Sequence, residues 1–339
     1  MSAAPGSPIR ICLLPGDGIG PEVIEQSARV LEALALPLDL VTAEIGFGAY
    51  QKTGSPLPEA TLAAIRSSKA ALFGAVTTPP DLPGYFSPVI RMRQAFDLYA
   101  NLRPCRSIPH PISRPGIDLV ILRENTEDLY AGIERVEAGG DRAIGEMIIT
   151  RRASERIARK AYQVARDSGY HKVTLVHKAN VLRETCGLFR RAALAVAEEF
   201  PDIATGEMLV DSCAMELVRD PGQFQVLVTT NMFGDILSDE ASMLVGGLGM
   251  ACSGNIGDGM AIFEPVHGSA PKLAGTGKAN PFAAILSAAM LVEYIGFPET
   301  AGRIRGAVDA LLVSNQVTED LGGALSTRQV TDCLLERLA

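Results

Sequence analysis

The chain has 339 residues, of which 47% are apolar and 21% charged, a composition typical of a globular protein. The formal net charge is −8, from 31 Lys and Arg against 39 Asp and Glu, which argues against a nucleic-acid-binding protein because such proteins need a basic surface. No apolar run is long enough to span a membrane, and the first ten residues lack the apolar core of a secretory signal.

Strand and helix patterns alternate along the chain. Buried strands are predicted at residues 9–15, 38–45, 70–74, 118–123, 172–177 and 224–229. Helices are predicted at residues 21–35, 58–67 and 154–167, and over most of 281–338. The alternation predicts an α/β fold with a largely parallel sheet, and the length predicts two domains at about 150 residues each.

Two segments interrupt this alternation. Residues 107–115 are rich in proline and predict a linker or a surface loop. Residues 137–147 combine turn residues with β character, which fits either an excursion that packs on a partner chain or a plain surface loop. Six cysteines and four histidines are scattered without a CxxC pair, which argues against a zinc site and favours free thiols in a reducing, cytoplasmic compartment.

A glycine-rich turn follows the first predicted strand, at residues 16–20 (GDGIG). It departs from the dinucleotide fingerprint GxGxxG because Pro21 and Glu22 stand where the pattern needs its third glycine. A tight strand-to-helix turn is therefore favoured over an ordinary Rossmann site.

Two aspartates, Asp235 and Asp239, are spaced to share one face of a helix. Their charges repel unless a cation or an arginine lies between them, and carboxylate oxygens suit Mg²⁺ or Mn²⁺. The alternative places Asp235 against the helix dipole and Asp239 in solvent. The spacing alone leaves both interpretations open.

Basic residues occur near the ends of predicted elements. Arg93, Arg103 and Arg123 suit the capture of carboxylates, although any one of them taken alone is more often a surface ion pair. Lys178 follows a predicted parallel strand, where open α/β sheets place ligands, and partial desolvation there would let its amine act as a base.

A series of motifs, in order along the chain, resembles the β-decarboxylating dehydrogenases that act on isocitrate, isopropylmalate and homoisocitrate. The resemblance runs from about residue 9 to the C-terminus. It rests on LLPGDGIGPE at 13–22, DLYANLRP at 97–104, RENTE at 123–127, HKAN at 177–180, GDILSD at 234–239, NIGD at 255–258 and FEPVHGSAP at 263–271.

The resemblance implies an isocitrate/isopropylmalate dehydrogenase-like α/β fold, two domains around a central largely parallel sheet, which is not a Rossmann fold. Residues 1–98 and 253–339 would form a large discontinuous domain on the cofactor side. Residues 99–252 would form a small inserted domain for the substrate, the metal and dimer contacts. It also implies a homodimer with shared active sites, with a tetramer left open.

The same resemblance implies roles for individual residues. The substrate carboxylates would be held by Arg93, Arg103 and Arg123, the acid would be Tyr130 and the base Lys178. Mg²⁺ or Mn²⁺ would be held by Asp235 and Asp239 of one subunit and Asp211 of the other. The dinucleotide would contact Thr77, Thr78, His267, Gly268, Ser269, Ala270, Lys272, Asn280 and Asp320.

The reaction implied is the oxidative decarboxylation of a 2-hydroxy acid that carries a β-carboxylate, with hydride transfer to NAD(P)⁺. Lys178 would remove the hydroxyl proton and Tyr130 would return a proton to carbon. A non-catalytic regulatory subunit is the alternative from another class. It is disfavoured because the acid, the base and all three implied metal aspartates are present.

Substrate choice in this family is implied by residues 86–93. Val89 replaces the Asn of isocitrate enzymes, and the Glu and Leu pair of isopropylmalate enzymes is absent. Ser87 begins a pattern similar to several homoisocitrate dehydrogenases, and its hydroxyl would reach the distal carboxylate, although one bacterial group has Arg where Ile90 stands. We expect homoisocitrate first, as in lysine biosynthesis through 2-aminoadipate, isocitrate second and isopropylmalate third.

The cofactor pattern is mixed. Lys272 matches a lysine of NADP-dependent isocitrate enzymes, but Leu273 and Glu319 replace the companion tyrosines and Gly323 replaces an arginine. NAD⁺ is therefore expected, with NADP⁺ as the alternative.

Overall fold

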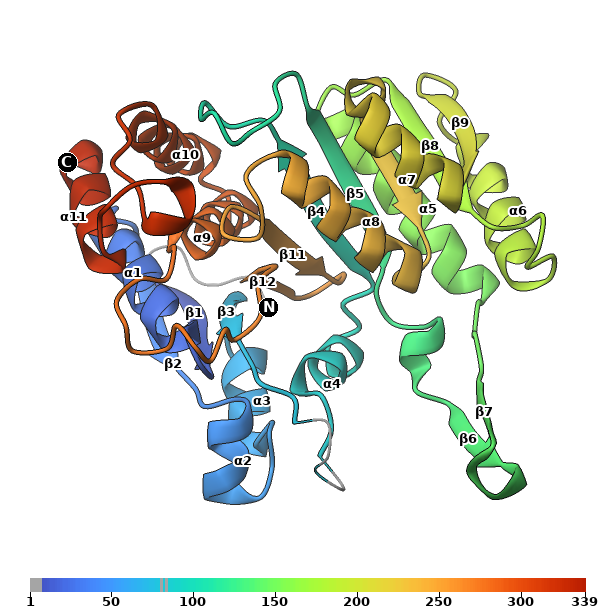
Figure 1. Ribbon diagram of the computed structural model, residues 1–339, viewed down its shortest axis with the longest axis horizontal. Helices are drawn as coiled ribbons and strands as arrows, with labels where there is room; N and C mark the ends of the chain where they lie inside the picture. The colour runs from blue at the N-terminus through green and yellow to red at the C-terminus, as the bar shows by residue number, and fades with distance from the viewer. Residues whose placement is uncertain (1–7, 80–81, 83–84) are drawn as a thin grey trace.

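A ten-stranded sheet organises the part of the chain that the computed structural model describes, residues 8–79, 82 and 85–339 (Figure 1). Its strand order is β2-β1-β3-β12-β11-β4-β5-β10-β8-β9. The strands are β1 Ile9–Gly16, β2 Leu38–Thr42, β3 Ala70–Ala75, β4 Ala100–Arg106, β5 Asp118–Glu124, β8 Lys172–His177, β9 Ala204–Leu209, β10 Val226–Thr229, β11 Cys252–Ile256 and β12 Ala261–Pro265.

Helices cover both faces of this sheet. They are α1 Gly20–Ala33, α2 Phe47–Thr53, α3 Glu59–Arg66, α4 Pro88–Ala95, α5 Arg151–Asp167, α6 Thr185–Ala197, α7 Val210–Arg219, α8 Asn231–Leu244, α9 Phe282–Tyr294, α10 Pro298–Val313 and α11 Thr327–Leu338. A separate hairpin of β6 Glu134–Glu137 and β7 Arg142–Gly145 projects from the body (Figure 1). The predicted α/β class is confirmed.

The sheet is parallel at both ends and antiparallel in the middle. β2, β1, β3 and β12 pair in parallel, as do β5, β10, β8 and β9. Between them β11 runs antiparallel to both β12 and β4, and β4 runs antiparallel to β5. The two parallel blocks therefore meet at a central reversal of strand direction.

One apolar core covers the face of the sheet that we call the rear face, from β1 to β8. Side chains such as Ile11 on β1, Phe263 on β12, Leu122 on β5 and Leu175 on β8 alternate toward it. The helices α1, α5, α6 and α9 pack on these strands, and α10 and α11 pack outside them on α9 and α1. Ser326 begins α11 with a capping box, which satisfies the free backbone amides there. This core joins both ends of the chain in a single packed layer.

The front face instead has two separate cores. One lies over β1 and β3 and includes Phe73 and Met92, and the other lies under α7 and α8 and includes Ile121 and Leu237. Between them, the front-facing positions of the central strands are polar or charged. Buried polar side chains on an otherwise apolar sheet face mark a candidate binding site.

The predicted elements are largely confirmed, with corrections at their ends. The strand predicted at residues 38–45 ends at Thr42, and the helix predicted from residue 154 begins three residues earlier, after Thr150 accepts a capping hydrogen bond from Ala153 N. Residues 107–115 form a loop, and β7 lies within the 137–147 excursion. The helices α2, α6 and α7 were not predicted.

The N-terminal strands and the C-terminal helices lie together at one end of the sheet (Figure 1). The division into residues 1–98 with 253–339 and residues 99–252 stays a prediction. None of the helices in the described residues is long and apolar enough to cross a membrane.

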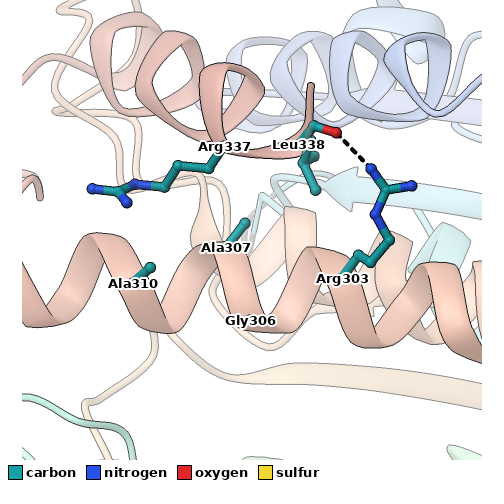
Figure 2. A pocket seen from close by; sticks show the side chains of 6 residues that line it. All are labelled: Arg303, Gly306, Ala307, Ala310, Arg337 and Leu338. Atoms are coloured by element: carbon teal, nitrogen blue, oxygen red, sulfur yellow. Dashed lines mark hydrogen bonds between the residues drawn. The ribbon is translucent and has the colours of Figure 1, made fainter.

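A hollow of about 400 Å³ lies between α10 and α11, on the rear side. Figure 2 shows Arg303 and Arg337 at its two ends and small side chains between them, with Arg303 donating a hydrogen bond to Leu338 O at 2.5 Å. Its lining includes none of the site residues predicted from the sequence.

The helix α1 crosses the strand β3 closely at Gly74. A Cβ at Gly74 would lie 2.4 Å from Pro15 O and 2.9 Å from Gly20 Cα. Gly74→Ala should therefore destabilise the protein by about 1–3 kcal/mol, since backbone has to move to make room. Gly302→Ala is the control, because nothing lies within 4 Å of that position on α10 and alanine favours a helix. The urea unfolding midpoint should fall only for Gly74→Ala, and equal midpoints would contradict the crossing.

Candidate active site

Three arginines meet on the front face of the central strands. Arg103 comes from β4, Arg123 from the end of β5 and Arg93 from the last turn of α4. All three are buried, and the Arg123 side chain is only 1% exposed. Buried guanidinium groups need carboxylate partners, so the structure brings together residues that the sequence alone could not show to converge.

The carboxylates come from α8, which packs against β4 and β5. Arg103 Nη1 donates to Asp239 Oδ1 at 2.9 Å, Arg103 Nη2 to Asp235 Oδ1 at 3.2 Å, and Arg123 Nη1 also donates to Asp235. Gly234 makes this approach possible, because a Cβ there would lie 2.6 Å from Arg123 Cβ. Asp235 and Asp239 thus share one helix face, as their spacing predicted.

The environment separates the two carboxyl groups of α8. Burial opposes the ionisation of Asp235, but Arg123, the Tyr130 hydroxyl and Arg103 outweigh it and hold the pKa of Asp235 below its usual value. Burial raises the pKa of Asp239, and Arg103 offsets this only in part. Burial, together with the nearby charges of Arg93 and Arg103, lowers the pKa of Arg123 to about 10. Positive charge is therefore crowded in this site.

Tyr130 reaches the same cluster from a short helical turn, η1 Leu129–Ala131. Its hydroxyl donates to Asp235 Oδ2 at 2.5 Å, and the Arg123 guanidinium lies 4.8 Å from the centre of its ring. Burial and then the hydrogen bond to Asp235 raise the pKa of Tyr130, so the hydroxyl stays protonated. This tyrosine can donate a proton into the arginine cluster.

A buried hydrogen-bond network links two of the arginines behind the site. Arg93 Nη2 and Asn255 Nδ2 donate to Glu264 Oε1 at 3.3 and 2.8 Å. Asn101 Nδ2 donates to Asn255 Oδ1 at 3.1 Å, and Arg103 Nε donates to Asn101 Oδ1 at 2.7 Å. The two asparagines and the glutamate lie in the motifs DLYANLRP, NIGD and FEPVHGSAP, but nothing in the sequence indicated a role for them. The network fixes the relative positions of two arginines.

Two buried donors in this region have no partner among the described residues. They are Arg93 Nε and Arg123 Nη2. Buried polar atoms in proteins are nearly always paired, so an unpaired guanidinium N–H in this polar region indicates an anion-binding site.

Lys178 and Asp211 form a separate pair. Lys178 Nζ lies 2.5 Å from Asp211 Oδ1, with the lysine at the end of β8 and the aspartate in the first turn of α7. This hydrogen bond lowers the pKa of Asp211. Within one chain, these two predicted site residues therefore contact each other, and the described contacts do not join them to the Asp235 cluster.

The donor set for a metal ion is incomplete within one chain. Asp235 and Asp239 are oxygen donors of the kind that Mg²⁺ and Mn²⁺ prefer. Across residues 8–79, 82 and 85–339, however, no group of three or more Asp, Glu, His or Cys side chains is placed to hold a metal. These two carboxylates could supply part of the ligand set of a metal ion, and a further ligand would have to come from outside this cluster.

The residues predicted for the dinucleotide gather around the β1–α1 turn. Thr77 Oγ1 donates to Ser269 Oγ at 2.8 Å, and Ile19 N donates to Ser269 O at 2.9 Å. Ala270 follows with a positive φ of 37°, and Thr78 and Gly268 are exposed beside them. His267 Nε2 is buried without a partner among the described residues, and burial lowers its pKa, which favours the neutral imidazole.

A second part of this region lies near the start of α9. Asn280 Nδ2 donates to Asp320 Oδ2 at 2.9 Å. Lys272 is exposed in the loop that joins β12 to α9. The buried unpaired imidazole nitrogen and this amide–carboxylate pair fit the polar groups of an adenosine. Ser87 lies outside both clusters, half-buried at the residue before α4, and its side chain makes no capping hydrogen bond.

Comparisons with known proteins identify the family of the chain. The family model described as isocitrate/isopropylmalate dehydrogenase matches residues 10–334. The chain is 52% identical over 330 residues to an isocitrate/homoisocitrate dehydrogenase from Thermus thermophilus, covering 97% of this chain and 98% of that protein. It is 46% identical to a 3-isopropylmalate dehydrogenase from Methanothermobacter thermautotrophicus, covering 95% and 96%.

The crystal structure of an isocitrate dehydrogenase from Methylococcus capsulatus is similar throughout. It superposes with a TM-score of 0.94 at 44% identity, covering 97% of this chain and 99% of that one. The family implies NAD(P) and a divalent metal as cofactors. The chain therefore belongs to the isocitrate/isopropylmalate dehydrogenase family and is an NAD(P)-dependent β-decarboxylating dehydrogenase.

Proposed function

We propose that this enzyme oxidatively decarboxylates homoisocitrate with NAD⁺ and Mg²⁺ or Mn²⁺, and that isocitrate is its second substrate. The observation that carries the proposal is the convergence of the buried Arg93, Arg103 and Arg123 on one sheet face, with two N–H groups among them that have no partner in the described residues. Only a polyanionic ligand can satisfy so much buried positive charge once the α8 carboxylates are engaged elsewhere.

Charge arithmetic supports a polycarboxylate. Three guanidinium groups face the three carboxylates of Asp235, Asp239 and Glu264, so the cluster is close to neutral by itself. A divalent cation held by Asp235 and Asp239 would leave a net charge of about +2. It would also release Arg103 and Arg123 from these aspartates to bind the carboxylates of a substrate.

The residues then divide the chemistry among themselves. When bound, the dinucleotide supplies a hydride acceptor and the cation supplies Lewis acidity. Arg93, Arg103 and Arg123 hold the substrate carboxylates and orient the carbon that loses hydride. Lys178 Nζ accepts the hydroxyl proton, and Tyr130 Oη donates a proton to carbon after CO₂ leaves.

A homodimer with shared sites explains why Lys178 and Asp211 lie apart from the arginines. The helices that carry Asp211 and Asp235 expose large apolar side chains, including Met215 (65% exposed) on α7 and Ile236 (59%) on α8. The β6–β7 hairpin adds Val136, which is 70% exposed. We propose that a second copy covers these faces and brings its Lys178 and Asp211 to the arginine cluster, with a tetramer left open.

The start of α4 supports the choice of substrate. Within the described residues Ser87 makes no side-chain hydrogen bond, and we propose that its hydroxyl donates to a distal carboxylate. Val89 packs against the front core beside β1 and β3. Isocitrate enzymes have an asparagine at this position, and valine has no side-chain amide to bind a carboxylate. The name of the Thermus relative includes both homoisocitrate and isocitrate, in keeping with this order.

Three features favour NAD⁺ over NADP⁺. A side chain at residue 323 would place its Cβ 2.0 Å from Val317 O, so this backbone cannot accommodate the arginine that NADP-dependent isocitrate enzymes have in place of Gly323. Glu319 is held in an ion pair with Lys278 at 2.9 Å, and Leu273 offers no hydroxyl. Lys272 remains as the one feature in favour of a 2′-phosphate. The free cysteines fit the reducing, cytoplasmic setting that we expect.

A panel of initial rates tests the substrate and the cofactor. Homoisocitrate, isocitrate and 3-isopropylmalate are each assayed with NAD⁺ and NADP⁺ in the presence of Mg²⁺ or Mn²⁺. Homoisocitrate with NAD⁺ should give the highest kcat/KM, because Ser87 and the three arginines suit three carboxylates. A tenfold or greater preference for isopropylmalate would contradict the interpretation of residues 87–90.

A complementation experiment tests the shared site. Asp235→Asn and Lys178→Ala homodimers should each be folded but inactive, and the unfolding midpoint should fall for Asp235→Asn, because the buried Arg123 loses the charge of its carboxylate partner. Unfolding and refolding them together should restore about one quarter of wild-type activity, because half of the dimers are mixed and each mixed dimer rebuilds one intact site. If each site is built from one chain, the mixture stays inactive. Refolding each variant alone is the control.

A further inference from the structure

Asp128 has an unusual backbone conformation in the segment that leads to Tyr130. Its φ of 74° and ψ of −150° lie in a region that glycine adopts and other residues avoid. The residue is completely buried. A non-glycine residue persists in such a conformation only where its surroundings hold it there.

The Asp128 carboxylate holds two segments together. Its Oδ1 accepts a hydrogen bond from Leu129 N at 2.8 Å, in the turn η1, and its Oδ2 accepts one from Met232 N at 3.0 Å, in the first turn of α8. No arginine, lysine or histidine forms an ion pair with it within the described residues. The positive end of the α8 dipole and these two amides therefore stabilise its charge.

Further hydrogen bonds fix the same junction from both sides. Asp128 N donates to Ile148 O at 2.8 Å, at the base of the projecting hairpin. Asn231, the first residue of α8, donates through Nδ2 to Glu127 O at 3.0 Å and accepts from Arg123 Nε at 2.8 Å. The chain before Tyr130 is thus attached to the start of the helix that carries Asp235.

We propose that Asp128 is a positioning residue that sets where the Tyr130 hydroxyl lies relative to the carboxylates of α8. Two contacts join the turn η1 to α8. Tyr130 Oη donates to Asp235 Oδ2 at 2.5 Å, and the Asp128 carboxylate binds the backbone N–H groups of Leu129 and Met232. The inference rests on the proposed role of Tyr130 as the proton donor. Asp128 itself would not contact the substrate, because its carboxylate binds the backbone N–H groups of Leu129 and Met232.

Three substitutions separate the carboxylate from the backbone conformation. Asp128→Gly accepts the φ and ψ values but loses both hydrogen bonds, Asp128→Asn keeps one oxygen acceptor, and Asp128→Ala loses both properties. We expect kcat for Asp128→Gly to fall by about tenfold or more, because a small misplacement of a catalytic group is costly. The KM for the acid should change little, because the three arginines still bind it. Asp128→Asn should retain more activity.

Asn315→Gly is the matched control. Asn315 also has a positive φ, 52°, but is exposed at the end of α10. This variant should keep its kcat. If kcat for Asp128→Gly stays within twofold of wild type while the protein remains folded, the proposal is wrong. Should that variant fail to fold, a wild-type kcat for the folded Asp128→Asn, in which one of the two hydrogen bonds is lost, would also overturn it.

A double-mutant cycle with Tyr130→Phe separates positioning from general destabilisation. If Asp128 acts through the tyrosine hydroxyl, Asp128→Gly should reduce kcat far less in the Tyr130→Phe background than in the wild type. Equal reductions in both backgrounds would overturn the inference and leave the role of Tyr130 intact. A wild-type kcat for Tyr130→Phe alone would instead overturn the proposed role of Tyr130, and the inference would fall with it.

Discussion

Buried guanidinium groups on a sheet face are the constraint on which this structure depends. Arg103 and Arg123 stand on adjacent antiparallel strands, where an ordinary sheet would place apolar side chains. Such charges are tolerated only when carboxylates and hydrogen-bond acceptors surround them. The helix α8, with Asp235 and Asp239 on one face and glycine at the point of closest approach, satisfies this requirement.

The same constraint explains the polar network behind the arginines. Asn101 and Asn255 face each other across the β4–β11 pairing, and Glu264 lies next along on β12. An asparagine amide both donates and accepts, so two of them in series can carry a hydrogen-bond chain from one arginine to another. The strands that build the floor of the site therefore bury polar groups without leaving most of them unpaired.

Sequence reasoning predicted the parts of the molecule that follow from local pattern. Strands buried on both faces, such as residues 118–123 and 172–177, read as continuous apolar runs, and the i, i+4 spacing of Asp235 and Asp239 put them on one helix face. The resemblance to the family supplied Tyr130, Asp211 and the dinucleotide residues. The structure groups Tyr130 with the three arginines and the α8 aspartates.

The rest depends on long-range pairing. The strands β4 and β11 carry asparagine, arginine or serine on one face, so neither has the apolar run that marks a strand, and the antiparallel centre of the sheet went unpredicted. The contact between Asn101 and Asn255 joins residues 154 positions apart. The turn at Asp128 gave no signal, because aspartate there masks a conformation that glycine would have revealed.

The two faces of the sheet have different mechanical roles. The rear core runs without a break from β1 to β8, whereas the two front cores are separate clusters with the buried arginines between them. Close-packed interiors resist compression, so we expect the continuous rear core to deform less than the divided front layer. Because the two front cores do not touch each other, a change in their spacing would be accommodated as twist in the strands around the reversal. Arg103 and Arg123 lie on two of those strands, so twisting of the sheet would change the spacing of these arginines.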